Sequence, residues 1–290
     1  MDDQITVFEK DLWPESFLEI PQPPKKLFII GQIPDPKEYT YLCVIGSRKY
    51  SSYGREVCEK LIEGLTGYPI VIVSGLALGI DSLAHESALL NGLKTVAFPG
   101  SGLSKKVIYP RNNFSLAQKI VNSGGCLISE LDPETKAAEW TFPQRNRLMA
   151  GISKAVLIIE AEEKSGTSIT AKLAIDYNKD VFAVPGSIFS TNSAGPNRLI
   201  RDGATPIRNA EDLLLALGFK PNDNIETPNK IIENCSPEEK EILVLLNEPM
   251  ARSEISRATG KSISEINQTL SIMEIKGIIK ESLGEINRSF

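Results

Sequence analysis

Histidine is nearly absent from the sequence, since His85 is the only one among 290 residues. A Ser-His-Asp triad or a Cys-His pair would have to use this residue, whose place on a predicted helix favours capping or packing. The cysteines Cys43, Cys58, Cys126 and Cys235 form no CxxC pair, and no residues have the spacing of metal ligands. We therefore predict no catalytic residues, no metal, no cofactor, and reduced thiols in a cytoplasmic protein.

Long hydrophobic runs and common nucleotide signatures are also missing. No apolar stretch approaches the roughly 18 residues that span a membrane, and the first residues, MDDQITVFEKD, do not resemble a signal peptide. Gly260-Lys261-Ser262 ends like a Walker A motif, but Ile255 stands where the upstream glycine is required, and the dinucleotide motif GxGxxG is not met. These absences disfavour a membrane protein, an ATPase and a dehydrogenase.

The composition is that of an ordinary globular protein, with 41% hydrophobic and 24% charged residues. The formal net charge of −5 argues against general affinity for nucleic acids. A local basic groove remains compatible with this total, because such a groove needs only a few well-placed groups.

The residue pattern divides the chain into four parts. Residues 1–39 are rich in proline, which forbids long helices and central strands, so we predict an extended arm with an edge strand at Leu27–Ile30. Residues 40–218 alternate apolar strands with amphipathic helices, which predicts an α/β fold with a Rossmann-like, doubly wound, mostly parallel sheet. Residues 219–236 have the composition of a linker. Residues 237–290 show three helix patterns and a final hairpin, which predict a small winged-helix domain.

The stretch from Ile70 to Asp81, IVIVSGLALGID, joins a buried strand to a helix through two glycines. We expect Asp81 to cap a helix over 82–91. Gly75 and Gly79 allow a ligand to approach the backbone, and the free N–H groups of a helix start suit a phosphate. The alternative is a tight turn that binds nothing.

Small-residue loops follow several predicted strands, and the carboxyl ends of parallel strands meet at one edge of a sheet. These loops are GSR (46–48), SGLALG (74–79), PGSG (99–102), SGT (165–167) and PGS (185–187). We expect the five loops to converge on one rim and to form a shared anion site. The residues selected from them as candidate contacts are Gly46, Ser47, Arg48, Ser74, Gly75, Gly79, Gly166 and Thr167.

Two segments supply further candidates for a single-strand site. Arg48 follows the first strand of the alternating pattern, where its guanidinium can hold a phosphate, unless it pairs with a nearby carboxylate. The segment WTFPQRNR combines aromatic, amide and guanidinium groups, which stack bases and hold a nucleic-acid backbone. Its candidates are Phe142, Gln144, Arg145, Asn146 and Arg147. The alternative is that the aromatic residues anchor the core while the arginines brace the fold.

Basic residues elsewhere are weaker candidates. Lys172 follows the SGT loop on a predicted helix and is expected to face the same rim. Asn197, Arg198 and Arg201 lie in a stretch that is equally compatible with a structural turn. The C-terminal segment holds more glutamates than lysines and arginines, and its expected recognition helix has no basic residue over 262–275. This composition favours a protein contact over DNA binding for that segment.

Several longer motifs together resemble the DNA-processing protein A (DprA, or Smf) family, in the family's order and over nearly the whole chain. They are GSR (46–48), SGLALGIDSLAH (74–85), YPRNN (109–113), FPQRNRLMAGIS (142–153), SGTSITAKLA (165–174), VPGS (184–187) and GPNRLIRDGA (195–204). The resemblance implies an extended Rossmann fold that binds single-stranded DNA, forms homodimers and has no established catalytic activity. It also implies a protein that protects incoming DNA and loads RecA recombinase during natural transformation or related recombination, displacing single-strand-binding protein. Arg48 matches the DNA-contacting arginine of this family.

Two departures from the family pattern are visible. Many members carry an N-terminal sterile-alpha-motif-like domain, which this sequence starts too late to hold. A C-terminal winged helix occurs in only some members.

Two other functions remain open. LOG-type nucleotide hydrolases share a glycine-rich pocket but require PGGxGTxxE, and Thr170 stands where their glutamate acts. A regulatory nucleotide sensor is also compatible with five small loops that surround one anion site.

Overall fold

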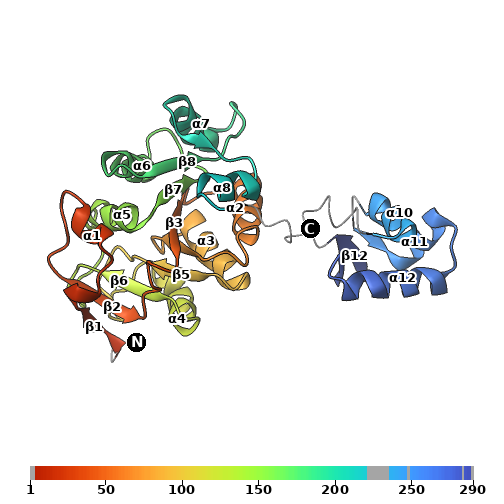
Figure 1. The fold of residues 1–290 in the computed structure, drawn as a ribbon, viewed down its shortest axis with the longest axis horizontal. Coiled ribbons are helices and arrows are strands. Elements are labelled where there is room, and N and C mark those ends of the chain that lie inside the picture. The colour runs from red at the N-terminus through yellow and green to blue at the C-terminus, as the bar shows by residue number, and fades with distance from the viewer. Residues whose placement is uncertain (1–3, 221–234, 247–248, 283, 289–290) are drawn as a thin grey trace. The chain divides into compact units, whose positions relative to one another are not determined.

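The computed structural model describes residues 4–220, 235–246, 249–282 and 284–288. The chain forms two compact units, Met1–Lys220 and Pro221–Phe290 (Figure 1). The proline-rich arm is part of the larger unit. Most of the predicted linker lies outside the described residues, although Phe219 packs its ring 5.6 Å from that of Tyr68. In the parts of the chain that the structure describes, no helix has the length and apolarity to cross a membrane, and no cluster of three potential metal ligands occurs.

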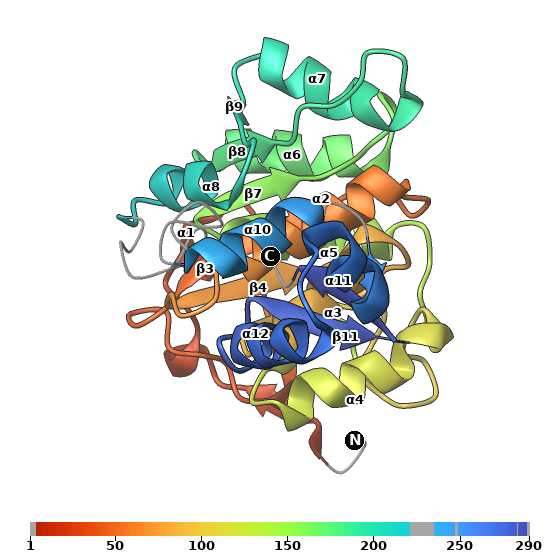
Figure 2. The same ribbon diagram turned by 90° about the vertical axis from the view of Figure 1, so that its right-hand side faces the viewer.

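The larger unit is built on a nine-stranded sheet with the order β1-β2-β6-β5-β4-β3-β7-β8-β9. Figure 2 shows the neighbouring strands β4, β3, β7, β8 and β9 of this sheet. Its strands are β1 (Thr6–Phe8), β2 (Leu27–Gly31), β3 (Thr40–Ile45), β4 (Ile70–Ser74), β5 (Lys94–Ala97), β6 (Cys126–Ser129), β7 (Ala155–Ile158), β8 (Asp180–Ala183) and β9 (Thr205–Pro206). All neighbouring strands in the run β6-β5-β4-β3-β7-β8-β9 pair in parallel. β2 pairs antiparallel with β6, and β1 pairs antiparallel with β2. The predicted mostly parallel, doubly wound α/β sheet is confirmed.

Helices cover both faces of this sheet because its strands are apolar on both sides. On one face, α1 (Ser16–Glu19), α5 (Thr141–Ile152) and α6 (Gly166–Asp176) share a core with alternate residues of β3 (Figure 1). On the other face, α2 (Ser52–Glu63), α3 (Ile80–Leu90) and α8 (Ala210–Ala216) pack on the remaining residues of that strand. The helices α4 (Phe114–Asn122) and α7 (Ala194–Arg201) and the short helices η2 (Lys10–Leu12), η3 (Arg111–Asn113) and η4 (Thr191–Ser193) complete the unit.

The strand at residues 27–31 does not lie at the edge of the sheet, contrary to the prediction. β2 pairs with β6 on one side and with β1 on the other. The prolines of the arm stand outside both strands, so they remove no ladder hydrogen bond. The arm therefore extends the sheet by two strands through two antiparallel pairings.

The start of α3 also differs from the prediction. The helix begins at Ile80, directly after Gly79 with its positive φ of 92°, so Asp81 lies in the first turn and does not cap it. Its carboxylate instead accepts a 3.1 Å hydrogen bond from the N–H of Gly75. Asp81 thus closes the loop that leads into the helix.

The direction of winding reverses between the neighbouring strands β3 and β7. From β3 the chain proceeds outward through β4, β5 and β6, then returns to add β7, β8 and β9 on the other side of β3. At such a reversal the connections leave the two neighbouring strands in opposite directions and open a crevice at their carboxyl ends.

The smaller unit contains the predicted helices α10 (Pro237–Leu245), α11 (Arg252–Thr259) and α12 (Ile263–Ile275). The hairpin β11 (Ile279–Ser282) and β12 (Glu285–Arg288) is joined by a short strand, β10 (Met250–Ala251). Ser236 and Ser262 start α10 and α12 with capping boxes. These elements enclose a core of their own.

Candidate functional site

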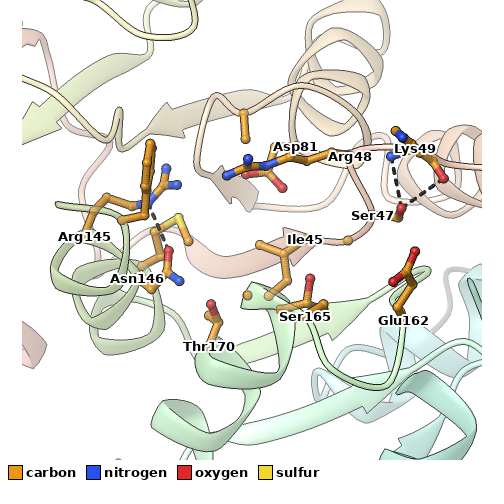
Figure 3. Close-up of a pocket in the computed structure, with 16 residues that line it drawn as sticks. Ile45, Ser47, Arg48, Lys49, Asp81, Arg145, Asn146, Glu162, Ser165 and Thr170 are labelled. Atoms are coloured by element: carbon orange, nitrogen blue, oxygen red, sulfur yellow. Dashed lines mark hydrogen bonds between the residues drawn. The ribbon is translucent and has the colours of Figure 1, made fainter. Parts of the chain in front are cut away.

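A cavity of about 480 Å³, called the main cavity below, opens at the crevice between β3 and β7 (Figure 3). Arg48 and Asp81 lie on one side of it, and Ser165 and Thr170 lie on the opposite side. Its walls come from the end of β3, the β4–α3 loop, α5 and the start of α6. The lining residues are Ile45, Gly46, Ser47, Arg48, Lys49, Ala77, Asp81, Phe142, Arg145, Asn146, Met149, Glu162, Ser165, Gly166, Thr167 and Thr170.

Arg48 presents an exposed guanidinium at the mouth of this cavity. Its central carbon lies 5.6 Å from the centre of the Phe142 ring, a cation–π distance. Within the described part of the chain, no carboxylate forms an ion pair with Arg48. The side chain is thus oriented by an aromatic ring but keeps its donors available for a ligand.

Arg145 is buried and acts as a brace, which favours the structural alternative for this residue. Its Nη1 donates to the carbonyl oxygens of Gly75 and Phe98, and its Nε donates to Oδ1 of Asn146 at 3.1 Å. Burial lowers the pKa of Arg145, and the charge of Asp81 opposes that shift. Burial raises the pKa of Asp81, and the positive charge of Arg145 is the strongest of the effects that lower it. Arg145 therefore holds together the loops after β4 and β5.

Arg147 and Gln144 lie away from the cavity. Arg147 is buried, pairs with Glu130, and donates from Nη1 to the carbonyl of Gln22 at 2.6 Å. It thereby ties α5 to the N-terminal arm. Gln144 lines a separate small hollow beside Glu130. Of the FPQRNR segment, only Phe142, Arg145 and Asn146 reach the main cavity.

A buried acid, Glu160, shapes the loop that carries Arg48. Its carboxylate accepts hydrogen bonds from the N–H of Ser51 at 2.8 Å and from the hydroxyl of Ser51 at 2.6 Å. Its own carbonyl accepts from the N–H of Ser47 at 2.6 Å. Because Ser51 is the N-cap of α2, the start of that helix already faces a carboxylate. We conclude that α2 offers no free anion site.

The glycines of the β4–α3 loop serve close packing inside the protein. A Cβ on Gly75 would lie 2.1 Å from Nη1 of Arg145, and one on Gly79 would lie 2.3 Å from the carbonyl oxygen of Ser47. Ser74 is buried and donates to the carbonyl of Val44 at 2.7 Å. We predicted that a ligand comes close to these two glycines, but Arg145 and the backbone of Ser47 lie there instead.

The start of α6 is the open wall of the cavity. Ser165 occupies the N-cap without a capping hydrogen bond, and its Oγ is buried with no partner among the described residues. The first N–H groups of a helix have no intrahelical acceptor, so Gly166 and Thr167 present donors here. Nothing lies within 4 Å of a Cβ built on Gly166, so a ligand has room to approach this backbone.

The remaining candidates lie outside the cavity. Lys172 is exposed on α6 but does not line the cavity, whereas Lys49, which sequence reasoning missed, does. Arg198 pairs with Glu163, and Arg201 pairs with Asp202. The side-chain amide of Asn197 accepts from the N–H of Gly186 at Oδ1 and donates from Nδ2 to the Gly186 carbonyl. Three of the five loops, 46–48, 74–79 and 165–167, reach the main cavity, while 185–187 packs against α7.

His85 is buried in α3 with no access to the cavity. Its Nδ1 bonds the hydroxyl of Thr95 at 2.7 Å, and that hydroxyl donates to the carbonyl of Ile72 at 2.7 Å. Burial lowers the pKa of His85 to about 3, so the ring is neutral near pH 7. The expected packing role agrees with these contacts.

Comparison with known proteins identifies relatives over most of the chain. DNA processing protein DprA of Streptococcus pneumoniae is 40% identical over 209 residues, which cover 72% of each protein. Protein Smf of Escherichia coli is 32% identical over 280 residues, covering 93% of this chain and 73% of its own. The solved structure of the S. pneumoniae protein superposes with a TM-score of 0.68 at 38% identity over 73% of this chain and 74% of its own.

A second solved structure concerns the single-stranded DNA binding mode of DNA processing protein A from Helicobacter pylori. It superposes with a TM-score of 0.67 at 32% identity, covering 74% of this chain and 95% of its own. The family model described as DNA recombination-mediator protein A matches residues 4–218, which contain the whole cavity. The chain therefore belongs to the DNA recombination-mediator protein A family.

Proposed function

We propose that the chain binds single-stranded DNA at the cavity between β3 and β7. Arg48 contacts a phosphate, the N–H groups at the start of α6 contact a neighbouring phosphate, and the Phe142 ring stacks a base. The observation that carries this proposal is the pairing of Arg48 with Phe142, a cation and an aromatic face that lie together and both border the cavity. Phosphate contacts of this kind position a strand, and aromatic faces bind bases with little sequence preference.

The H. pylori relative supports the same ligand class, since its structure concerns single-stranded DNA binding. We further propose that the bound strand is protected and passed to RecA recombinase, with displacement of single-strand-binding protein, in natural transformation or related recombination. A homodimer would place two cavities on one strand and raise its effective affinity. Light scattering at micromolar protein tests this point, and a monomer alone contradicts it.

We also propose that the protein binds DNA without cleaving or modifying it. Arg48 and the N–H groups at the start of α6 are donors to anions, and Asp81, one of the two carboxylates that line the cavity, already accepts the N–H of Gly75. Incubation of labelled single strands with the protein, followed by gel electrophoresis, tests this proposal. Cleaved or altered strands contradict it.

The direct test is fluorescence anisotropy with a labelled single strand across a salt series, comparing Arg48→Ala with the wild type. Loss of one phosphate contact reduces the slope of log affinity against log salt by roughly 0.7. Arg55→Ala is a matched control, because the guanidinium of Arg55 lies 5.4 Å from the Tyr50 ring but does not line the cavity. Equal affinity and slope for Arg48→Ala and the wild type contradict the assignment.

A mononucleotide sensor is the second candidate, since a cavity of about 480 Å³ has the size of small-ligand sites. Thr170, which stands where the LOG hydrolases carry glutamate, lines the cavity, and a threonine hydroxyl is a poor acid or base for glycosidic cleavage. Competition of free nucleotides against the labelled strand separates the candidates. Thermal stabilisation by a mononucleotide, together with absence of DNA binding, favours the sensor.

A further inference from the structure

A second, smaller hollow lies beside the main cavity and shares several of its walls. Arg48, Ala77, Phe142 and Arg145 border both spaces. The second hollow has a volume of only about 30 Å³ and is completed by Gly75, Leu78, Gly100, Tyr109 and Pro110. It is too small to enclose a nucleotide, but the exposed side chains of Leu78 and Tyr109 form a ledge at its border, and such a ledge suits one flat face.

Besides Arg48, the exposed side chains beside this hollow are apolar or aromatic. Tyr109 and Leu78 are 46% and 45% exposed. The Tyr109 ring lies 5.9 Å from that of Phe142 at a tilt of 53°. Phe142 thus has the cation of Arg48 and the ring of Tyr109 as neighbours.

The backbone holds these groups in place. The N–H of Tyr109 donates to the hydroxyl of Ser101 at 3.2 Å. Asn113 donates from Nδ2 to the carbonyls of Leu76 and Ala77 at 2.7 and 3.2 Å, which fixes the loop that presents Leu78. A Cβ on Gly100 would lie 2.5 Å from the Phe142 ring, so the ring rests directly on that backbone. The ledge is therefore preorganised, which reduces the entropy lost on binding.

The charge of the ledge favours an anionic ligand with flat apolar parts. Among the described residues that border the hollow there is no carboxylate, and Arg48 supplies an exposed guanidinium, whereas Arg145 is buried as a brace. Aromatic faces beside cations are typical of sites for unpaired nucleic-acid strands. A base inside a duplex has no free face to offer, so the ledge also selects single strands.

We infer that the ledge of Leu78 and Tyr109 stacks a second nucleobase, next to the one at Phe142. The inference rests on the proposed binding of single-stranded DNA and extends it. The strand passes from the main cavity over Arg48 and onto Tyr109, so the phosphate between the two bases lies at Arg48. The site thus spans at least two successive nucleotides.

The test compares Tyr109→Ala, Tyr109→Phe and the wild type by anisotropy with a labelled oligothymidylate. Stacking on one aromatic ring changes affinity by roughly 5- to 100-fold, so we expect Tyr109→Ala to weaken binding within this range. Tyr109→Phe keeps the ring and retains the affinity. The salt slope stays unchanged in both, because Tyr109 contacts no phosphate. Phe189→Ala is the control, since this aromatic residue is 92% exposed and borders neither hollow.

An abasic series adds a readout that a folding defect does not produce. Removal of one base weakens binding to the wild type, and the same removal has a smaller effect on Tyr109→Ala because the stacking partner is already lost. If the wild type binds single strands and Tyr109→Ala binds them with the same affinity, the inference about the ledge is wrong, while the proposed function stands. An equal effect of base removal on both proteins also overturns the inference about the ledge. Absence of wild-type binding to single strands overturns the proposed function and the ledge together.

Discussion

Replacement of Arg145 by alanine separates a brace from a DNA contact. The substitution removes the donors that satisfy the carbonyls of Gly75 and Phe98, and it leaves Asp81 buried without its nearest compensating charge. Orphaned buried acceptors cost about 1–3 kcal/mol each, and an uncompensated buried charge costs about 3–5 kcal/mol. Since relaxation and water entry recover part of these costs, we expect a loss of about 3–5 kcal/mol of unfolding free energy.

That loss is large against the roughly 5–15 kcal/mol that stabilises a typical domain. For a unit of this size it corresponds to a fall in Tm of roughly 6–20 °C. Urea unfolding followed by tryptophan fluorescence measures it selectively, because both tryptophans, Trp13 and Trp140, lie in the larger unit. The double variant Arg145→Ala/Asp81→Asn should lose less than the sum of the single variants, since neutralising Asp81 removes the uncompensated charge.

The opposite result would refute this assignment. If Arg145→Ala keeps the wild-type unfolding free energy but loses affinity for single strands, the guanidinium contacts the ligand directly. Arg48→Ala provides the comparison in the same assays. Its side chain is exposed and lacks an ion pair among the described residues, so we expect weaker binding with unchanged stability.

Three further predictions concern the glycines, His85 and Lys172. Gly79→Ala places a Cβ against backbone at a φ of +92°, so its Tm should fall by several degrees, whereas Gly166→Ala should fold normally and lose affinity only if the ligand approaches that backbone. Because the pKa of His85 falls from 6.5 to about 3 on folding, its contribution to stability is complete above pH 6.5 and declines as the pH falls towards 3. We expect a loss of about 2 kcal/mol between pH 7.5 and pH 5 in urea unfolding, which His85→Gln should lack. Lys172→Ala should bind single strands like the wild type, and weaker binding with a lower salt slope would return Lys172 to the site.

The sequence was sufficient for the alternating architecture because most of the parallel strands are short apolar runs separated by amphipathic helices. Ile70–Val73 and Ala155–Ile158 are examples, and both are completely buried in the sheet. The place of β2 was not predictable in this way. Its apolar run is compatible with an edge or an interior strand, and only the pairing of Thr6–Phe8 with it decides between them.

Within the site, residue type was easier to predict than residue role. Arg48, Arg145 and Arg147 all stand in polar motifs, and nothing in their local sequence distinguishes an exposed guanidinium from a buried one. The difference depends on distant parts of the chain: Arg145 is enclosed by the loops after β4 and β5, and Arg147 is covered by Gln22 of the arm. Tyr109 was missed as a contact because its position beside Phe142 depends on the β5–α4 loop.

The glycine-rich edge of the sheet contains several potential anion sites, and the protein's own carboxylates fill some of them. Glu160 accepts the N–H of Ser51 at the start of α2, and Asp81 accepts the N–H of Gly75 in the β4–α3 loop. At α6 the N-cap side chain of Ser165 leaves the N–H groups uncapped, and Arg48 faces that wall across the cavity (Figure 3). This selective filling explains how a chain with a net charge of −5 can offer a defined site to a polyanion.

The same arrangement predicts that Glu160→Gln holds the Arg48 loop less firmly, since a neutral amide binds the start of α2 less strongly than a carboxylate does. A lower affinity for single strands, with Arg48 itself unchanged, would support this view, whereas wild-type affinity and Tm would contradict it.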